Sequence, residues 1–464
     1  MGTARLHARG STRTCAKKLE QHRFAQTVFI PMRHARISSD LFRANRDRLR
    51  QSLLPQSVVL VNANDIAPTN ADGTAPYYPN TDLFYLTGVE QEESVLLLAP
   101  DAHLERNREI MFLRETNDHI ARWEGHKLTK DEATAVSGVA HVKWLHELPG
   151  FLRMLMLEAE NVYLNSNEHA RATVDVETRD ARFIREIQNR FPLHRYHRLA
   201  RILHALRPVK SDPELELIRK AADVTRDAYK RVARFVKPGV NECEIEAEFI
   251  HEFTRQRSRF AYSPIIASGP NACVLHYVQN DQPCRKGDIL LLDVAAGYAN
   301  YNADVTRSLP VSGRFTRRQR QVYQSVLRVL RKCSDALTPG KLPRDWQKEA
   351  ESYMEEELLR LELITTRDIK KQDPNWPAVK KYFMHGVGHP LGLDVHDVAT
   401  IGAPFAPGWV MTVEPGIYIP EEGLGIRLED DILITENGNV NLTSEIPIEP
   451  DEVEDSMNKG RRSR

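Results

Sequence analysis

The sequence predicts an α/β protein of two domains, a small α/β domain followed by a larger α+β domain. The chain has 464 residues, which is more than one domain usually holds. Short apolar runs alternate with helical patterns over residues 38–190, as in a small α/β domain. Long amphipathic helices and then short strands with glycine-rich turns follow. We therefore place the two domains at 38–195 and 196–452.

The composition is that of an ordinary soluble globular protein. Hydrophobic residues make up 41% and charged residues 28% of the chain, and the formal net charge is zero. A balanced charge attracts neither nucleic acid nor an acidic membrane, and no apolar run reaches the length of a transmembrane helix. The five cysteines form no CxxC pair, which argues against a disulfide framework or a zinc finger. We expect a cytoplasmic protein that binds no nucleic acid and no membrane.

The two ends of the chain differ from the rest. The first 31 residues hold six Lys or Arg and a single acid, Glu20. Mitochondrial targeting peptides are basic and acid-poor in the same way, so import is an alternative to the cytoplasmic location. We expect residues 1–37 to be a disordered extension and residues 453–464 a polar tail.

Periodicity and capping signals predict the elements of the first domain. Helices are predicted over 39–53 and 127–135, where apolar residues recur at helical spacing. Short apolar runs are typical of strands. Strands are accordingly predicted over 57–63, 94–100, 109–115 and 161–166, and a strand-like segment over 84–88.

The second domain is predicted to begin with long helices. The clearest covers 211–236, with Ser211 or Asp212 as its cap and Pro213 in the first turn. Further amphipathic helices are predicted over 241–257, 316–337 and 345–364.

The segment 287–311 reads as two strands joined by a tight turn, with one carboxylate on each arm. Asp293 closes an apolar run in which aspartate is unfavourable. A turn near Tyr298 and Ala299 would make Asp293 and Asp304 close cross-strand neighbours. Buried like charges this close need a cation between them.

Other polar residues also stand inside apolar segments. They are His276, His385, His389, His396, Glu414 and Glu429. A lone histidine of this kind is more often a satisfied core residue, and Arg427 is an ion-pair partner available to Glu429. Their joint occurrence with the two aspartates favours a pair of divalent ions roughly 3.5–4 Å apart. An oxygen-rich ligand set favours Mn²⁺, with Co²⁺ or Zn²⁺ as alternatives.

Several segments resemble the pita-bread metallopeptidase family, in its Xaa-Pro aminopeptidase branch. They are LHY, LLLDVAAGYANYNADVTRSLPVSGRFT, HGVGHPLGLDVHD, TVEPGIYI, GIRLEDDILIT and PYYPNTDLFYLTGVEQEESVLLL. The resemblance covers about residues 39–450. It implies a creatinase-like α/β N-terminal domain, followed by a pita-bread catalytic domain whose curved antiparallel sheet is covered by helices.

The resemblance also implies roles for individual residues. The metal ligands would be Asp293, Asp304, His389, Glu414 and Glu429. Asp304 and Glu429 would bridge the two ions, and Glu414 would also shuttle the proton. The other implied site residues are the catalytic His276, His385 and His396, and the substrate-binding Tyr418 and Arg427.

The implied activity is that of a dinuclear metal-dependent aminopeptidase. It would release the N-terminal residue from peptides with proline second, through a metal-bridging hydroxide. An Xaa-Pro dipeptidase (prolidase) is the alternative, and the complete ligand set argues against a non-catalytic peptide- or protein-binding module. Relatives form dimers or tetramers, which implies a homo-oligomer. Trp123 would either cap the active site of a neighbouring subunit or belong to the core of its own domain.

Overall fold

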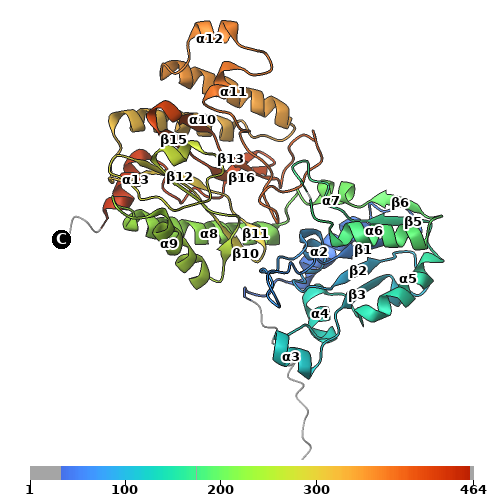
Figure 1. The fold of residues 1–464 in the computed structure, drawn as a ribbon. Coiled ribbons are helices and arrows are strands. Elements are labelled where there is room, and N and C mark those ends of the chain that lie inside the picture. Colours follow the sequence, from blue (N-terminus) through green and yellow to red (C-terminus); the bar gives the residue numbers. More distant parts are fainter. Residues whose placement is uncertain (1–32, 174, 460–464) are drawn as a thin grey trace, which may run out of the picture.

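The computed structural model describes residues 33–173 and 175–459, and it confirms the mixed α/β fold with two lobes (Figure 1). The first lobe is built on a six-stranded sheet in the order β4-β3-β2-β1-β5-β6. Its strands are β1 (Ser57–Asn62), β2 (Val95–Leu98), β3 (Glu109–Leu113), β4 (His141–Trp144), β5 (Asn161–Leu164) and β6 (Arg195–Arg198). Its helices are α1 (Ser39–Arg50), α2 (Thr81–Thr87), α3 (Asp118–Glu124), α4 (Lys130–Ser137), α5 (Leu148–Met156), α6 (Arg179–Arg190) and α7 (Ala200–Leu206).

One predicted element of this lobe has the wrong type. The segment expected as a strand over 84–88 lies in helix α2 and its C-cap. The side chain of Asn80 caps the helix by accepting from the backbone N–H of Leu83 at 3.0 Å, and Gly88 ends it at a φ of 67°. Those two caps outweigh the β-propensity of the aromatic run between them. The predicted strands β1, β2, β3 and β5 are present, whereas β4, β6 and α5 were not predicted.

The second lobe consists of small antiparallel sheets with helices on both sides. In Figure 1, α10 and α11 cover one side of these sheets, with α12 beyond α11, and α8 and α9 cover the other side. The helices are α8 (Asp212–Phe235), α9 (Glu242–Arg255), α10 (Arg317–Asp335), α11 (Pro343–Arg360), α12 (Thr366–Lys371) and α13 (Pro450–Asn458). The strands are β7 (Arg259–Phe260), β8 (Ile265–Ser268), β9 (Ile289–Asp293), β10 (Ala296–Tyr298), β11 (Tyr301–Asn302), β12 (Thr306–Pro310), β13 (Val410–Val413), β14 (Gly416–Ile419), β15 (Leu424–Arg427), β16 (Asp430–Thr435) and β17 (Gly438–Asn441). The sheet orders are β11-β10-β7, β12-β9-β8, β13-β16-β17 and β14-β15.

Both ends of the described chain are more ordered than the sequence predicted. The expected polar tail begins within α13, which buries Val453 and Met457 one turn apart in the hydrophobic core. At the other end, the expected disordered extension contains His34, which is buried and lies 3.3 Å from Glu90. Residues 1–32 lie outside the described part of the chain. Among the described residues, no helix combines the length and apolar character needed to span a membrane.

The two lobes share a hydrophobic core. One continuous cluster of buried residues includes Phe42 and Leu203 of the first lobe and Tyr301, Leu391 and Leu433 of the second. The hairpin over 287–311 and the 389–397 loop both contribute residues to this cluster. Packing between the lobes therefore helps to fix the segments that carry the polar residues singled out in the sequence.

Arg307 fixes the strands of the second lobe to one another. It is fully buried on β12 and donates to the carbonyl oxygens of Glu429 at 2.6 Å, Thr306 at 3.1 Å and Ile446 at 3.2 Å. It also pairs with the carboxylate of Asp430 at 2.7 Å. The Arg307 guanidinium thus joins β12 to Glu429 and to Asp430 at the start of β16.

We expect Arg307→Met to lower the free energy of unfolding by roughly 3–5 kcal/mol, because it leaves Asp430 buried without its cation. Arg320→Met is the matched control, since Arg320 pairs with Asp451 and Glu454 at the surface. The control should cost less than about 1 kcal/mol. Denaturant unfolding of both variants measures the difference, and equal costs would contradict this role of Arg307.

Candidate metal centre

The predicted hairpin forms and turns through Ala299 and Asn300. Both residues have positive φ, 50° and 66°, as a two-residue type I′ connection requires. The register places Thr306 opposite Asp293, so Asp304 lies diagonal to Asp293. The charge of Asp293 is close enough to raise the pKa of Asp304. The two carboxylates are therefore neighbours, as the sequence predicted.

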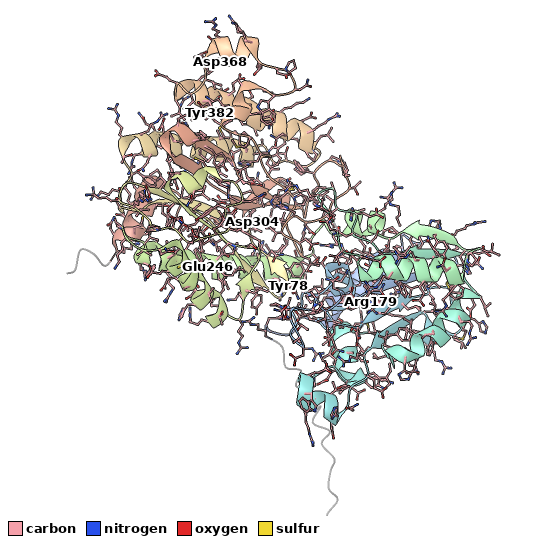
Figure 2. All side chains as sticks on the ribbon, viewed as in Figure 1. Tyr78, Arg179, Glu246, Asp304, Asp368 and Tyr382 are labelled. Atoms are coloured by element: carbon pink, nitrogen blue, oxygen red, sulfur yellow. The ribbon has the colours of Figure 1, made fainter. Side chains whose placement is uncertain are left out.

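Two later segments bring further ligands to Asp304. The ligand atoms of Asp304, His389 and Glu429 all lie within 4.8 Å of one another, and all three residues are buried. Nε2 of His389 is 3.5 Å from Oδ2 of Asp304 and 3.6 Å from Oε1 of Glu414. Figure 2 labels Asp304 in the interior of the second lobe. Residues more than eighty positions apart thus converge on one small volume.

The electrostatics of this cluster suit a bound cation. Burial, and next the charge of Asp293, raises the pKa of Asp304 well above its usual range. Burial and Asp304 do the same to the pKa of Glu429, and burial raises the pKa of Glu414 to about 7. Each carboxylate resists ionisation beside the others unless positive charge is supplied. This donor set fits divalent ions bound by oxygen and imidazole.

The surroundings of His389 suit it to act as a neutral metal ligand. Its Nδ1 donates to the carbonyl oxygen of Pro390 at 3.0 Å, which leaves Nε2 directed at Asp304. Burial, and next the proximity of His396, lowers the pKa of His389 to about 3. A neutral imidazole with its other nitrogen held by a carbonyl is the usual form of a metal-bound histidine.

Arg427 organises the opposite side of the centre. Its guanidinium pairs with Oδ2 of Asp293 at 2.6 Å and donates to the hydroxyl of Tyr418 at 2.9 Å. That hydroxyl lies 2.9 Å from Nε2 of His385, to which it donates. The ion-pair partner of Arg427 is therefore Asp293, and the pairing with Glu429 considered from the sequence is wrong. Its Nε instead donates to Thr306 at 3.1 Å.

Thr306 and Tyr262 are residues of this centre that sequence reasoning missed. The hydroxyl of Thr306 donates to Oε2 of Glu429 at 2.6 Å, and that of Tyr262 donates to Oδ1 of Asp293 at 2.6 Å. Thr306 stands two residues after Asp304 on the same face of the hairpin, which is the signal that could have found it. Tyr262 comes from a separate segment, and no local pattern distinguishes it.

The remaining histidines surround the centre on its open side. The rings of His396 and His389 lie 4.2 Å apart, and Nη1 of Arg171 is 3.0 Å from Nδ1 of His396. Partial burial and the Arg171 cation lower the pKa of His396 to about 4. His276 is exposed, yet its charge contributes to lowering the pKa values of both His385 and His396. Cavities of about 750 Å³ and 360 Å³ meet at His396 and Arg171.

Most of the residues singled out in the sequence are thus brought together. Those that contact one another around the centre are Asp293, Asp304, His385, His389, His396, Glu414, Tyr418, Arg427 and Glu429. Trp123 is different, because 79% of it is exposed on α3. The interpretation of Trp123 as a core residue of its own domain is wrong.

The two-lobed fold and the carboxylate–histidine centre define a metal-dependent hydrolase. A model of metallopeptidase family M24 matches residues 216–436, and one of the aminopeptidase P N-terminal domain matches residues 42–163. The Xaa-Pro aminopeptidase of Escherichia coli is 34% identical over 444 residues, covering 92% of this chain and 99% of that protein. The chain belongs to metallopeptidase family M24, among the proteins that carry an aminopeptidase P N-terminal domain.

Solved structures agree with this assignment. Zinc-substituted Escherichia coli aminopeptidase P in complex with product has a TM-score of 0.81 and 33% identity, over 92% of this chain and 99% of that chain. Pseudomonas aeruginosa aminopeptidase PepP has a TM-score of 0.83 and 29% identity, over 92% and 100%. Both lobes are therefore shared with aminopeptidase P structures.

We expect Mn²⁺ binding to the metal-free protein to release protons at pH 6. Glu414 has a pKa of about 7 and is mostly protonated there, whereas a ligand must be ionised. The apparent affinity should consequently rise between pH 6 and pH 8. Titration calorimetry in buffers of different ionisation enthalpy measures the released protons, and Glu414→Gln should release fewer. Heats that do not depend on the buffer would be the contrary result.

Proposed function

We propose that this metal-dependent aminopeptidase removes the N-terminal residue from peptides with proline in second position. The convergence of Asp304, His389 and Glu429 within 4.8 Å carries the proposal of metal-dependent hydrolysis. The preference for proline is supported by the similarity to Xaa-Pro aminopeptidases along nearly the whole chain. The Xaa-Pro bond is a tertiary amide with a fixed φ, which requires a dedicated site.

Two divalent ions would be held by five residues of the second lobe. They are Asp293, Asp304, His389, Glu414 and Glu429. We propose that Asp304 and Glu429 are shared between the ions and that Mn²⁺ is the native metal, with Co²⁺ or Zn²⁺ as alternatives. When bound, such ions activate a water molecule as the nucleophile and polarise the scissile carbonyl.

Glu414 is suited to proton transfer. It is half-buried, and its Oε2 lies 3.9 Å from Nδ1 of His385. A carboxylate beside the attacking water can take its proton and return it to the leaving amine. We assign both transfers to Glu414.

The open-side histidines are suited to substrate contact. His385 and His396 are neutral at pH 7, because burial lowers their pKa values to about 3 and about 4. We propose that they and His276 bind the substrate or its developing oxyanion. Tyr418 and Arg427 are fully buried behind His385 and Asp293, which supports a positioning role for this pair in addition to the predicted substrate binding.

The cavity beside His396 favours an aminopeptidase over a dipeptidase. It has a volume of about 750 Å³ and lies between the lobes, lined by Tyr78, Asn165 and Asp394 among others. A space of this size accommodates more than a dipeptide.

With metal-loaded protein, we expect release of the first residue from Xaa-Pro-Yaa tripeptides and at least tenfold slower release from Xaa-Ala-Yaa. Longer Xaa-Pro peptides should be cleaved at least as well as the Xaa-Pro dipeptide, because the cavity provides room beyond the second residue. Amino acid analysis of the products measures both comparisons. Cleavage of the dipeptide alone would establish the prolidase alternative, and failure to cleave any of them would sink the proposal.

We expect Asp304→Ala and His396→Ala to lose activity for different reasons. The first removes a ligand proposed to be shared by both ions, so bound metal should fall. The second removes a group beside the ligands, so metal should remain while kcat falls roughly 10²–10³-fold. Metal analysis of the dialysed proteins separates the two, and equal metal retention would contradict a shared role for Asp304.

The exposed Trp123 bears on the oligomeric state, and the basic first 31 residues bear on the location. We propose a homodimer or homotetramer, in which a second copy covers the exposed Trp123 of α3. Sedimentation of the wild-type chain and of Trp123→Ser tests this. We also propose a cytoplasmic location, and the basic first 31 residues keep mitochondrial import as the alternative.

A further inference from the structure

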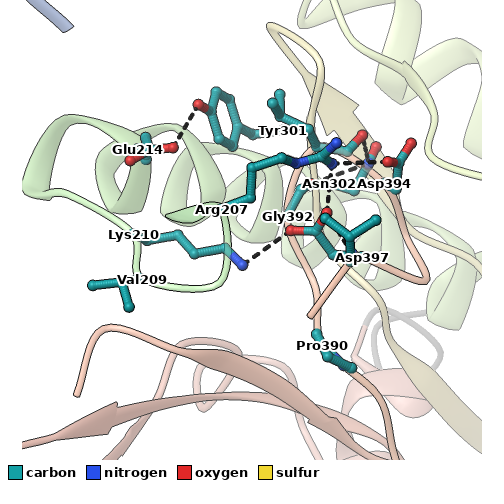
Figure 3. Close-up of polar contacts among 12 residues, drawn as sticks. Arg207, Val209, Lys210, Glu214, Tyr301, Asn302, Pro390, Gly392, Asp394 and Asp397 are labelled. Atoms are coloured by element: carbon teal, nitrogen blue, oxygen red, sulfur yellow. Dashed lines mark hydrogen bonds and ion pairs between the residues drawn. The ribbon is translucent and has the colours of Figure 1, made fainter. Parts of the chain in front are cut away.

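A buried ionic cluster joins the two lobes next to the metal centre. At its middle is Arg207, whose side chain is 2% exposed. Its guanidinium contacts Asp82 of the first lobe at 2.7 Å, and Asp394 and Asp397 of the second at 2.8 Å and 2.5 Å. It also donates to the hydroxyl of Thr81 at 3.2 Å. Figure 3 shows the Arg207 side chain extended toward Asp394 and Asp397.

Asp397 receives a second buried cation. Nζ of Lys210 lies 3.0 Å from its Oδ2, and the side chains of Asp397 and Lys210 are 1% and 2% exposed. The packing leaves no spare room, because a Cβ on Gly392 would lie 2.2 Å from Oδ2 of Asp397 and 2.9 Å from Cε of Lys210. The carboxylate is thus held on both oxygens (Figure 3).

Asp397 is connected to the metal centre through the chain around it. Its backbone N–H donates to the carbonyl oxygen of Pro390 at 2.9 Å. That same oxygen accepts from Nδ1 of His389 at 3.0 Å and so fixes which nitrogen of His389 faces Asp304. His396, whose ring lies 4.2 Å from that of His389, is the residue directly before Asp397.

The loop is also tied to the metal-site hairpin. Nδ2 of Asn302 donates to the carbonyl oxygens of Gly392 at 3.2 Å and Leu393 at 2.9 Å, and its backbone N–H donates to Gly392 at 2.9 Å. Asn302 stands two residues before Asp304. One side of the 389–397 loop therefore contacts the hairpin, and the other contacts the Arg207 cluster.

We propose that Asp397, clamped by Arg207 and Lys210, is a positioning residue that holds His389 and His396 in their working geometry. Because Arg207 also binds Asp82, the clamp connects the first lobe to the metal-binding loop. The clamp acts through the two histidines, although Arg207 itself lines the 750 Å³ cavity and Asp397 the 360 Å³ one. The part concerning kcat rests on the proposed peptidase activity, whereas the part concerning His389 rests only on its proposed role as a metal ligand.

The composition of the cluster supports a positioning role over a purely stabilising one. The two buried cations and the carboxylate of Asp397 lose most of their hydration, and such groups are seldom more stable than well-packed apolar side chains. What they provide is directionality, because each ion pair and hydrogen bond fixes one orientation. Supporting contacts of metal ligands usually affect metal affinity or activity 10- to 100-fold.

The test uses the full chain and two substitutions, Asp397→Asn and the milder Lys210→Met. Co²⁺ titration of the metal-free proteins should show an affinity roughly 10-fold lower than wild type in both. This measurement needs no substrate, so it stands even if the proposed peptidase activity fails. Arg46→Met is the matched control, since Arg46 is as buried as Lys210 and pairs with the less buried Glu109 at 2.6 Å inside the first lobe. It should lower thermal stability and leave Co²⁺ affinity unchanged.

A double-mutant cycle with His396→Ala tests the second part. At saturating metal, Asp397→Asn should lower kcat roughly 10-fold in the wild-type background and less than about 3-fold in His396→Ala, because its effect passes through that histidine. Lys210→Met in the same cycle replaces Asp397→Asn if the latter does not fold. Wild-type Co²⁺ affinity in the variants, or losses that are additive with His396→Ala, would overturn the proposal.

Discussion

Mutual repulsion of buried carboxylates is the constraint on which the catalytic lobe depends. Asp304, Glu414 and Glu429 share one small volume, and burial together with the charges of Asp304 and Glu414 raises the pKa of Glu429. Among the described residues, two arginines lie around this volume. Arg427 pairs with Asp293, and Arg307 holds Glu429 by its carbonyl oxygen and Asp430 at the start of β16. Bound metal ions would supply the positive charge that these neighbouring carboxylates require in order to be ionised together.

The supporting groups share one arrangement. Hydroxyls and carbonyl oxygens contact the ligands directly, as with Thr306 on Glu429 and Pro390 on His389. Arginines then fix the segments that carry those groups. The neutral contacts to Glu429 and His389 leave their remaining lone pairs available to a metal, whereas Asp293 is contacted by the Arg427 cation itself. The geometry of the centre is consequently determined by residues that do not bind metal themselves.

The carboxylates that the structure brings together could be recognised in the sequence because a carboxylate beside an apolar run is a conflict visible in one dimension. Asp293, Glu414 and Glu429 all show it. The contact of Arg427 with Asp293 could not be predicted, since it depends on how β15 packs against β9. Tyr262 was missed for the same reason. Its hydroxyl reaches Asp293 from a segment with no distinguishing pattern.

The prediction of secondary-structure elements was limited in the same way. Uninterrupted apolar runs such as β1 were recognised, whereas β4, with only Val142 fully buried, gave no clear alternation. The segment 84–88 was misassigned because aromatic residues are compatible with strands, and the caps of α2 lie just outside the run. Local propensity was informative where a segment is apolar and buried throughout, as in β1, and it failed where tertiary contacts decide.

The hydrophobic cluster that runs from Phe42 to Leu433 bears on how such proteins can diversify. Because its residues come from both lobes, neither lobe can be exchanged for that of a distant relative without leaving cavities or clashes at the seam. Chimeras joined near residue 206 would have to transfer the partners of Leu203 and Leu391 together. The two lobes are therefore expected to change in concert, as one inherited unit, even though each has its own architecture.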